Sequence, residues 1–338
     1  MIDAMPFVTM MIVVRNEEEY IGSAVLSLLK QDYPKDRCEL LIIDGMSTDQ
    51  TIENARETVA NHSGRTEAIT VRYLENPGKL LACGWNIGIK EAKGDYVVRI
   101  DAHAQADPFL VSKCVKILQE REDVACAGGC IEARTVTGKG KIISYVMSSP
   151  FGVGNARFRY GTDSGYVDTV AYGIYRKSIF KEAGYFNEDF RRNQDNDMHG
   201  RIKQCGGRFY LEASIKNIYY SRSTIRGMIR QAAGNGKWNM IVYKKSQSKD
   251  GLSLRHLVPF FFVCVNVCLG ILGMFYPVSF ICLGGIYVLY FSMAVFFAFK
   301  KTKNIYHILQ MCGCYWLLHI SYGAGSLGEC FRWRGKGT

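Results

Sequence analysis

Short apolar runs alternate with amphipathic stretches along roughly the first 220 residues of the chain. The apolar runs predict strands at residues 7–14, 38–44, 69–75 and 95–102. The stretches between them carry one apolar stripe and predict helices at residues 18–31, 47–60 and 80–92. We expect Ser47 or Thr48 to cap the second helix. Strands that alternate with helices indicate an α/β domain with a largely parallel sheet.

Polar residues follow three of these expected strands at the point where each strand ends. They are Arg15-Asn16-Glu17, Asp44-Gly45 and Asp101-Ala102-His103. In parallel α/β sheets, ligands bind beyond the carboxyl ends of the strands. The sequence therefore predicts a binding site at this edge of the sheet.

The last third of the chain is much more apolar. Residues 257–299 carry no formally charged side chain, and Pro277 lies near the middle of this run. Because a spanning helix needs about 20 residues, we expect a hairpin of two transmembrane helices, with a buried core hairpin as the alternative. Basic clusters at 243–249 and 300–304 flank the run, and the positive-inside rule places both at the cytoplasmic face. A third apolar stretch at 305–325 either spans, re-enters or lies in the interface.

The segment 221–255 joins the two parts of the chain. Apolar side chains recur there at helical spacing, at Ile225, Met228, Ile229 and Ala232, beside Arg226 and Arg230. This pattern predicts an amphipathic helix at the lipid headgroups. We therefore expect an α/β domain over 1–220, an interfacial region over 221–255 and a membrane domain over 256–338.

Composition narrows the class of protein further. The chain has 338 residues, of which 48% are hydrophobic and 22% charged, so we expect a packed core rather than disorder. The formal net charge of +11 suits phosphates or an anionic membrane surface. Nucleic-acid binding is not expected, because the basic residues gather near the apolar segment while the strand ends are acidic. The twelve cysteines include no CxxC pair and predict reduced thiols, and the N-terminus lacks the pattern of a cleavable signal peptide.

The polar strand ends favour phosphate chemistry through a metal ion. No GxGxxG follows the first strand and no GxxxxGK[ST] is present, which disfavours dinucleotide dehydrogenases and P-loop proteins. Asp101 and His103 stand two residues apart, so on an extended backbone they point to the same face. Their oxygen and nitrogen donors suit Mn²⁺ or Mg²⁺ that also carries diphosphate oxygens. The alternatives are a hydrogen-bonded loop histidine at His103 and a helix cap at Asp44.

Three segments resemble family 2 glycosyltransferases, across roughly residues 6–220. They read VTMMIVVRNEEEYIGSAVLSLLKQDYP, ELLIIDGMSTDQT and NPGKLLACGWNIGIKEAKGDYVVRIDAHA. The resemblance is closest to the membrane-tailed, succinoglycan-type transferases that assemble bacterial exopolysaccharides. It implies a GT-A fold, which is a Rossmann-like mixed sheet that binds a nucleotide sugar.

The resemblance also implies roles for single residues. The positions expected to hold the nucleotide-sugar donor are Val14, Asn16, Glu17, Asp44, Lys79 and Asp101. Asp101-x-His103 stands where the family has its metal-binding Asp-x-Asp motif, which implies that Asp101 and His103 hold the metal. His103 replaces a carboxylate, and this departure leaves open the choice of metal and whether His103 binds it directly or through water.

The segment GYFNEDFRRNQDNDMHGRIKQCGG resembles the family's Glu-Asp-x-Asp segment, whose aspartate is the catalytic base. The match implies that Asp195 is the base, with Gln194 in place of the glutamate. An acceptor hydroxyl must lose its proton as the diphosphate leaves, so a carboxylate is needed beside it. The alternative for Asp195 is favourable acidic charge at a helix N-terminus. Glu188 and Asp189 form a rival carboxylate pair.

These features together imply an inverting, metal-dependent glycosyltransferase. We expect it to move a sugar from a UDP-sugar to a lipid-linked saccharide at the cytoplasmic side of the inner membrane, in surface or exopolysaccharide synthesis. A polyprenyl-phosphate glycosyltransferase or a polysaccharide synthase of the same family is one alternative. A catalytically inactive, nucleotide-binding scaffold of a membrane complex is the other.

Overall fold

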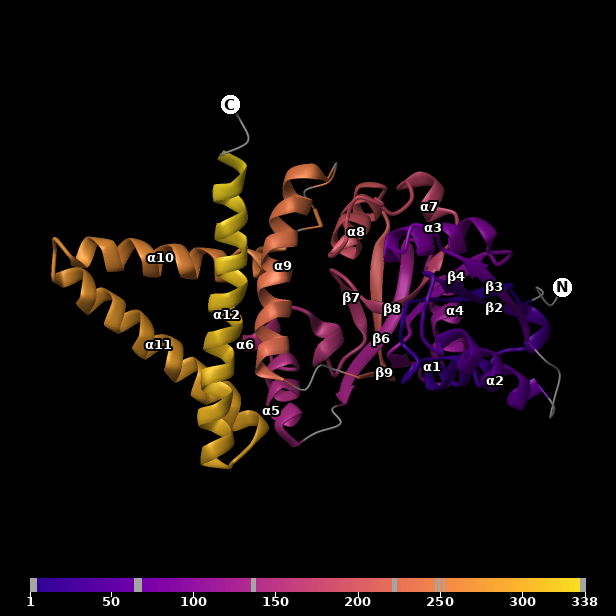
Figure 1. Cartoon of the computed structure of the whole chain (residues 1–338), viewed down its shortest axis with the longest axis horizontal. Coiled ribbons are helices and arrows are strands. Elements are labelled where there is room, and N and C mark those ends of the chain that lie inside the picture. The colour runs from indigo at the N-terminus through magenta and orange to yellow at the C-terminus, as the bar shows by residue number, and fades with distance from the viewer. Residues whose placement is uncertain are drawn as a thin grey trace. The chain divides into compact units, whose positions relative to one another are not determined.

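The computed structural model describes residues 5–63, 69–134, 138–220, 224–246, 248, 250–251 and 253–334. The chain divides into two compact units, one of residues 1–132 and 161–220 and one of residues 133–160 and 221–338. The first unit combines strands with helices, and the second is built from helices (Figure 1). The α/β domain expected over 1–220 therefore encloses a segment, 133–160, that packs with the helical unit instead.

A mixed sheet forms the centre of the first unit. Its strands in the described residues are β1 Val8–Val14, β2 Cys38–Asp44, β3 Thr70–Glu75, β4 Tyr96–Asp101, β5 Ala104–Gln105, β6 Val124–Arg134, β7 Gly165–Val167, β8 Ala171–Arg176 and β9 Arg208–Tyr220. Their order is β3-β2-β1-β4-β8-β6-β9-β5, with β7 paired to β9. The first four strands in this order are parallel, and β8 runs antiparallel to both β4 and β6. The mixed sheet implied by the resemblance is confirmed.

Helices cover both faces of this sheet. They are α1 Ile21–Leu29, α2 Thr51–Ser63, α3 Leu81–Glu91, α4 Leu110–Glu120, α7 Ile179–Glu182 and α8 Gln194–Gln204, with a 3₁₀ turn at Lys35–Arg37. In Figure 1, α1 and α2 lie below the sheet and α3 lies above it. The second helix begins only at Thr51, so the cap predicted at Ser47 or Thr48 is wrong. The chain forms a turn there instead, which Asp44 and Asn16 hold in place.

Helix α3 lies unusually close to the strands beneath it. A Cβ at Gly84 would collide with the side chain of Val13, and one at Gly88 would lie 2.6 Å from the sulfur of Met11. These two glycines let the helix pack directly on β1 and β2. The close packing brings the residues just before α3 to the ends of the parallel strands.

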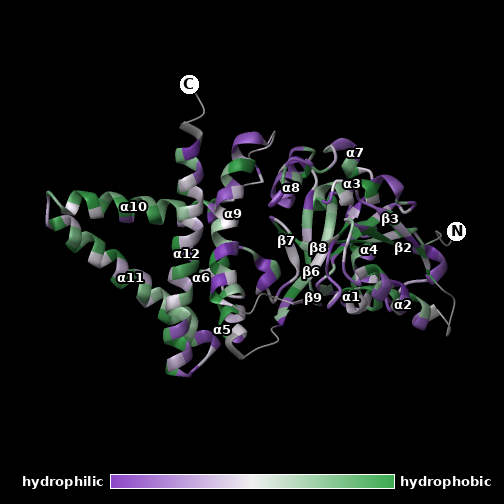
Figure 2. Ribbon diagram, in the orientation of Figure 1, coloured by the Kyte–Doolittle hydropathy of each residue, from purple (hydrophilic) through white to green (hydrophobic). Residues whose placement is uncertain are grey.

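The second unit is a helical assembly. Its elements are α5 Gly138–Met147, α6 Pro150–Val153, α9 Ile225–Lys245, α10 Val258–Gly273, α11 Val278–Lys301 and α12 Ile305–Arg334, with 3₁₀ turns at Arg157–Arg159 and Leu254–His256. Residues Leu254–Gly273 and Val278–Lys301 form two helices that are long and apolar enough to cross a membrane. Hydrophobic residues cover α10 and α11 along most of their length (Figure 2), and most of these side chains are exposed within the unit.

The expected interfacial helix forms, but its apolar stripe has a different partner. Met228 and Ala232 of α9 are buried in one cluster with Met311 and Tyr315 of α12. The prediction that this stripe lies on lipid headgroups is therefore wrong for Met228 and Ala232, because another helix covers them. The stretch expected at 305–325 is part of a single helix of 30 residues.

Candidate active site

The four parallel strands end at the same edge of the sheet. Val14 is level with Asp44, Asp44 with Glu75, and Val13 with Asp101. The turns after β1, β2, β3 and β4 therefore leave the sheet together. This register brings polar residues from separate parts of the sequence to one edge, as the sequence predicts.

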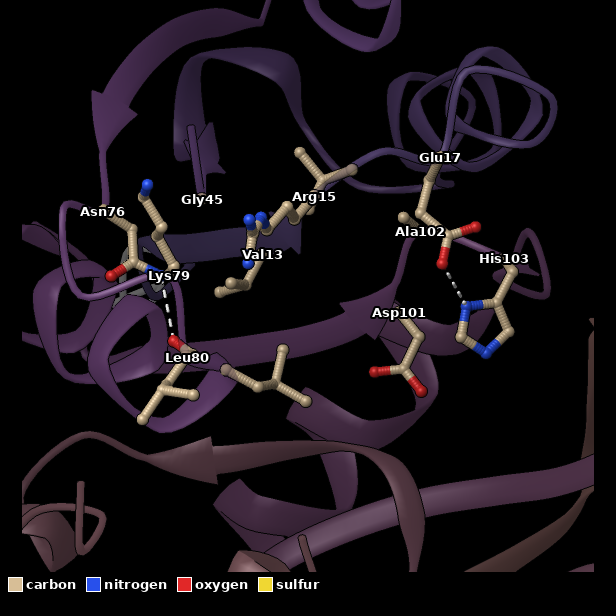
Figure 3. A pocket seen from close by; sticks show the side chains of 12 residues that line it. Val13, Arg15, Glu17, Gly45, Asn76, Lys79, Leu80, Asp101, Ala102 and His103 are labelled. Carbon is tan, nitrogen blue, oxygen red and sulfur yellow. Dashed lines mark hydrogen bonds and ion pairs between the residues drawn. The ribbon is translucent and has the colours of Figure 1, made fainter. Parts of the chain in front are cut away.

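A pocket of about 230 Å³ opens at this edge (Figure 3). Its lining residues are Val13, Val14, Arg15, Glu17, Gly45, Asn76, Lys79, Leu80, Leu81, Asp101, Ala102 and His103. The set includes five of the predicted site residues, which are Val14, Glu17, Lys79, Asp101 and His103.

Two carboxylates and an imidazole gather at one end of the pocket. Oε1 of Glu17 lies 3.5 Å from Nδ1 of His103, as the dashed line in Figure 3 marks. The His103 ring also contacts the ring of Tyr219 in an edge-type arrangement, at 5.2 Å between centroids. The hydroxyl of Tyr172 donates a hydrogen bond of 3.3 Å to Oδ2 of Asp101. All three polar side chains from Glu17, Asp101 and His103 thus face the same small volume.

The route by which Asp101 and His103 meet differs from the prediction. Strand β4 ends at Asp101, and His103 lies in the turn before β5 rather than on a shared strand face. This turn is fixed by β9, because the backbone N–H of Tyr220 donates to the carbonyl of His103 at 3.1 Å. The pair reaches one pocket through a tight turn.

Asn76 and Lys79 stand at the other end of the pocket. The Asn76 amide donates a 2.9 Å hydrogen bond to the carbonyl of Leu80. The buried amide oxygen of Asn76 has no hydrogen-bond partner among the described residues. Lys79 adopts a left-handed backbone with φ of 57°. The Lys79 side chain adds a positive charge to this end of the pocket.

Asn16 and Asp44 do not line the pocket, although both were predicted to touch the donor. The Asn16 amide oxygen accepts from the backbone N–H of Thr48 at 2.9 Å. Oδ1 of Asp44 accepts from the hydroxyl of Ser47 at 2.6 Å. The first bond fastens the turn after β1 to the turn after β2, and the second closes the turn after β2. Their predicted contact with the nucleotide stays a prediction.

Asp195 lies in the first turn of α8, outside the pocket lining, and binds Arg99 of β4. Both carboxylate oxygens accept from the guanidinium, with distances of 2.5 Å and 2.9 Å. Burial raises the pKa of the Asp195 carboxyl, but attraction to Arg99 outweighs it and holds this pKa below its ordinary value. The rival carboxylate of Glu188 accepts a 2.8 Å hydrogen bond from Asn86.

The sequence profile described as Glycosyl transferase family 2 matches residues 9–184, slightly more than half of the chain. The chain belongs to glycosyl transferase family 2.

Two curated relatives cover most of the chain. One, from Methanococcus voltae, is a dolichyl N-acetyl-alpha-D-glucosaminyl phosphate 3-beta-D-2,3-diacetamido-2,3-dideoxy-beta-D-glucuronosyltransferase. It is 28% identical over 275 residues, covering 80% of this chain and 83% of that protein. The other is the succinoglycan biosynthesis protein ExoA of Rhizobium meliloti (strain 1021). It is 25% identical over 248 residues, covering 72% of each chain.

A solved structure supports the GT-A fold of this family 2 member. The mannosyltransferase PcManGT from Pyrobaculum calidifontis, in complex with GDP-Man and Mn²⁺, matches with a TM-score of 0.63 and 16% identity. The match covers 96% of this chain and 88% of that one. At this identity the likeness concerns the fold alone.

The residues suited to hold a divalent metal are Asp101 and His103. Among the described residues, no group of three or more His, Cys, Asp or Glu side chains is arranged to hold a metal ion. Two protein donors would leave most positions around such an ion open. That arrangement fits an ion whose remaining positions are filled by substrate phosphates and water.

Two residues of this region, Asn76 and Arg99, were not predicted from the sequence. Asn76 directly follows the third parallel strand and carried the same signal as the other strand-end residues. Arg99 is a charged residue inside the apolar run YVVRID, and such a residue is rarely buried without a partner. The local sequence indicates that Arg99 needs a partner, but it does not identify Asp195.

Proposed function

We propose that this family 2 glycosyltransferase transfers a sugar from a UDP-linked donor to a lipid-linked saccharide, with inversion at the anomeric carbon. One observation carries the proposal. Glu17, Lys79, Asp101 and His103 come from three separate turns and line a single pocket at the carboxyl edge of the parallel strands. A diphosphate needs positive charge beside it and a metal-binding carboxylate within reach, and the pocket supplies both.

The donor end of the reaction rests on Asp101 and His103. These residues would hold Mn²⁺ or Mg²⁺, and a bound divalent ion neutralises charge on the leaving diphosphate. Glu17 faces Nδ1 of His103, where a carboxylate fixes the tautomer and orientation of a histidine ligand. We therefore assign Glu17 to the positioning of His103. Lys79 lies at the opposite end of the pocket and attracts the phosphates of the donor.

The acceptor end of the reaction rests on Asp195. Its carboxylate accepts the proton of the acceptor hydroxyl as that oxygen attacks the anomeric carbon. The side chain of Asp195 is 40% exposed, so it remains accessible while it pairs with Arg99. A single displacement by one base inverts the anomeric centre. Glu188 and Asp189 remain the rival pair for this role.

The helical unit supports a membrane-bound acceptor. Its two apolar helices are long enough to cross a membrane, and the basic clusters that flank them favour the cytoplasmic side. The names of the two curated relatives, a glucuronosyltransferase of dolichyl N-acetylglucosaminyl phosphate and a succinoglycan biosynthesis protein, agree with this acceptor class. We propose that the protein works at the inner membrane in surface or exopolysaccharide synthesis.

The proposal is tested by calorimetric titration of UDP into the detergent-solubilised protein, with and without Mn²⁺. The variants are Asp101→Ala and His103→Ala. Asp36→Ala is the matched control, because it removes a carboxylate whose side chain is 70% exposed and remote from the pocket. We expect Mn²⁺-dependent binding in the native protein and the control, and its loss in both pocket variants.

Other outcomes would change the proposal in distinct ways. Binding that ignores Mn²⁺ would contradict the role of His103 and Asp101 as metal ligands. Binding of GDP in place of UDP would overturn the UDP-linked donor. If UDP binds, a panel of UDP-sugars with lipid-linked saccharides follows, read by UDP release and product size. Addition of one sugar supports the proposal, whereas long products would favour the polysaccharide synthase.

A further inference from the structure

Arg99 is a buried cation in an otherwise apolar strand. Only 5% of the residue is exposed, and its neighbours Val97, Val98 and Ile100 in β4 are buried as well. Removing a charge from water costs several kcal/mol by order of magnitude unless a partner offsets it. A cation at this position therefore has to be explained by what it binds.

The guanidinium of Arg99 is fixed on two sides. Its edge forms the two-pronged ion pair with Asp195 described above, and its face stacks on the ring of Trp85, with 3.6 Å from Cζ to the ring centroid. Trp85 in turn contacts Phe186 at 4.8 Å, and the amide of Asn86 bonds both the N–H and the carbonyl of Phe186 at 2.8 Å. The ring, the guanidinium and the carboxylate form a rigid stack.

The two ends of this ion pair lie in different surroundings. The side chain of Arg99 is 6% exposed, whereas that of Asp195 is 40% exposed. A planar guanidinium that grips both oxygens fixes the plane of a carboxylate, which a lysine cannot do. The buried cation thus holds the more exposed acid in one orientation.

Arg99 also ties Asp195 to the metal-binding residue. Arg99 and Asp101 are two apart on β4, so they share one face of the strand at a spacing of roughly 6–7 Å. One strand therefore carries both Asp101 and the anchor of Asp195. The spacing of Arg99 and Asp101 along β4 therefore links the position of the base to that of the metal-binding carboxylate.

We propose that Arg99 is a positioning residue for the base, acting through Asp195 and supported by Trp85. The inference rests on the proposed function, in which Asp195 removes the acceptor proton. A displacement of about 1 Å at such a group can cost roughly 10²-fold in rate, so the stack sets the turnover number rather than the affinity for the donor.

The test measures kcat, KM for the UDP-sugar selected by the panel, and UDP binding on the full-length protein in detergent. The variants are Arg99→Lys, Arg99→Met, Asp195→Asn and the double variant Arg99→Lys with Asp195→Asn. Arg201→Lys is the matched control, because Arg201 is also half of a buried pair, with Asp197 on α8. We expect Arg99→Met to lower kcat about 10²-fold and Arg99→Lys to recover part of the loss. In both, UDP affinity and KM should stay within about threefold of native, as should all three parameters of the control.

The double variant separates positioning from a structural role. If Arg99 acts through Asp195, adding Arg99→Lys to Asp195→Asn lowers kcat no further. Additive losses, or equal losses in Arg99→Lys and Arg201→Lys, would overturn the proposal. Full activity of Arg99→Lys and Arg99→Met beside an inactive Asp195→Asn would overturn it while leaving the proposed base intact. An active Asp195→Asn would instead refute Asp195 as the base, and the inference with it.

Discussion

Helix α8 carries two aspartates that stand two residues apart in the sequence but form different ion pairs in the structure. Asp195 and Asp197 both lie in its first turn, and each binds an arginine. The Asp197 side chain is 2% exposed, and its partner Arg201 also donates to the carbonyls of residues 183, 184 and 185. The Asp195 side chain is 40% exposed, and its partner comes from β4.

From this difference we infer that Asp197 stabilises the fold, whereas Asp195 is exposed enough to react with a substrate. The pair of Asp197 and Arg201 fastens α8 to the loop before it, and almost none of its carboxylate reaches solvent. The pair of Asp195 and Arg99 leaves one acid partly open while its cation is buried. Pairing with an arginine therefore does not by itself indicate function, and the exposure of the acid distinguishes the two.

Replacing each acid by its amide should give the largest contrast. We expect Asp195→Asn to lower kcat by about 10²–10⁴-fold, because the amide cannot accept the proton. Asp197→Asn should retain kcat within a few fold. The measurement is UDP release under saturating donor, normalised to the UDP-binding sites counted by calorimetry. If folded Asp197→Asn loses as much activity as Asp195→Asn, the contrast between the two acids is wrong.

Replacing each arginine should affect stability in the opposite order: the Asp197 pair should matter more for the free energy of unfolding, whereas the Asp195 pair matters more for kcat. Arg201→Met removes the arginine partner of a buried carboxylate, and we expect it to lower the free energy of unfolding by about 3–5 kcal/mol. Arg99→Met should cost less, because the exposed side of Asp195 lets water hydrate the carboxylate. Urea titration of the two variants in the same detergent measures the difference. Equal losses would show that the two pairs are structurally equivalent.

The pH dependence of catalysis should distinguish the pairs more finely. Arg99 holds the pKa of Asp195 below its ordinary value, so the Asp195 carboxylate of the native protein stays ionised until the pH falls through that lowered value. The groups that face Asp195 are Arg99, His199, Tyr175 and Cys126. In Arg99→Met the burial remains and the attraction is lost, so the acidic limb of kcat/KM should move to higher pH. Arg201→Met should leave this limb unmoved.

The lowered pKa of Asp195 also makes the free energy of unfolding depend on pH. A carboxyl whose pKa is lowered by folding adds stability above its unfolded pKa, and this stability is lost as the pH falls through the folded pKa. Lowering the pH below the ordinary pKa of aspartate should therefore reduce the free energy of unfolding of the native protein more than that of the Arg99→Met variant. A pH series of urea titrations measures this directly.

Local patterns in the sequence predicted the parallel half of the sheet well. The apolar run CELLIID matches β2 from Cys38 to Asp44, and the polar residues after the strands do meet at one edge. These features depend on side-chain periodicity and on strand ends, both of which are local. The family resemblance adds the GT-A fold and the candidate base.

Long-range contacts account for what the sequence did not predict. Arg99 and Asp195 are 96 residues apart, and only the fold brings them together. The turn that carries His103 depends on pairing with β9, more than one hundred residues later. The apolar stripe of α9 looked suited to lipid, yet α12 covers it. In each case the local pattern is satisfied by a distant partner that it does not specify.

The backbone around the site has one more consequence. Among the described residues, Met46, Lys79 and Tyr172 combine a left-handed backbone with an ordinary side chain, and the first two lie in turns after parallel strands while Tyr172 binds Asp101. Each such residue costs roughly 1–2 kcal/mol, and a whole domain is stable by only about 5–15 kcal/mol. The active-site rim is therefore the part of the first unit expected to relax earliest on warming. We expect heat to abolish turnover at a temperature where the sheet beneath is still folded.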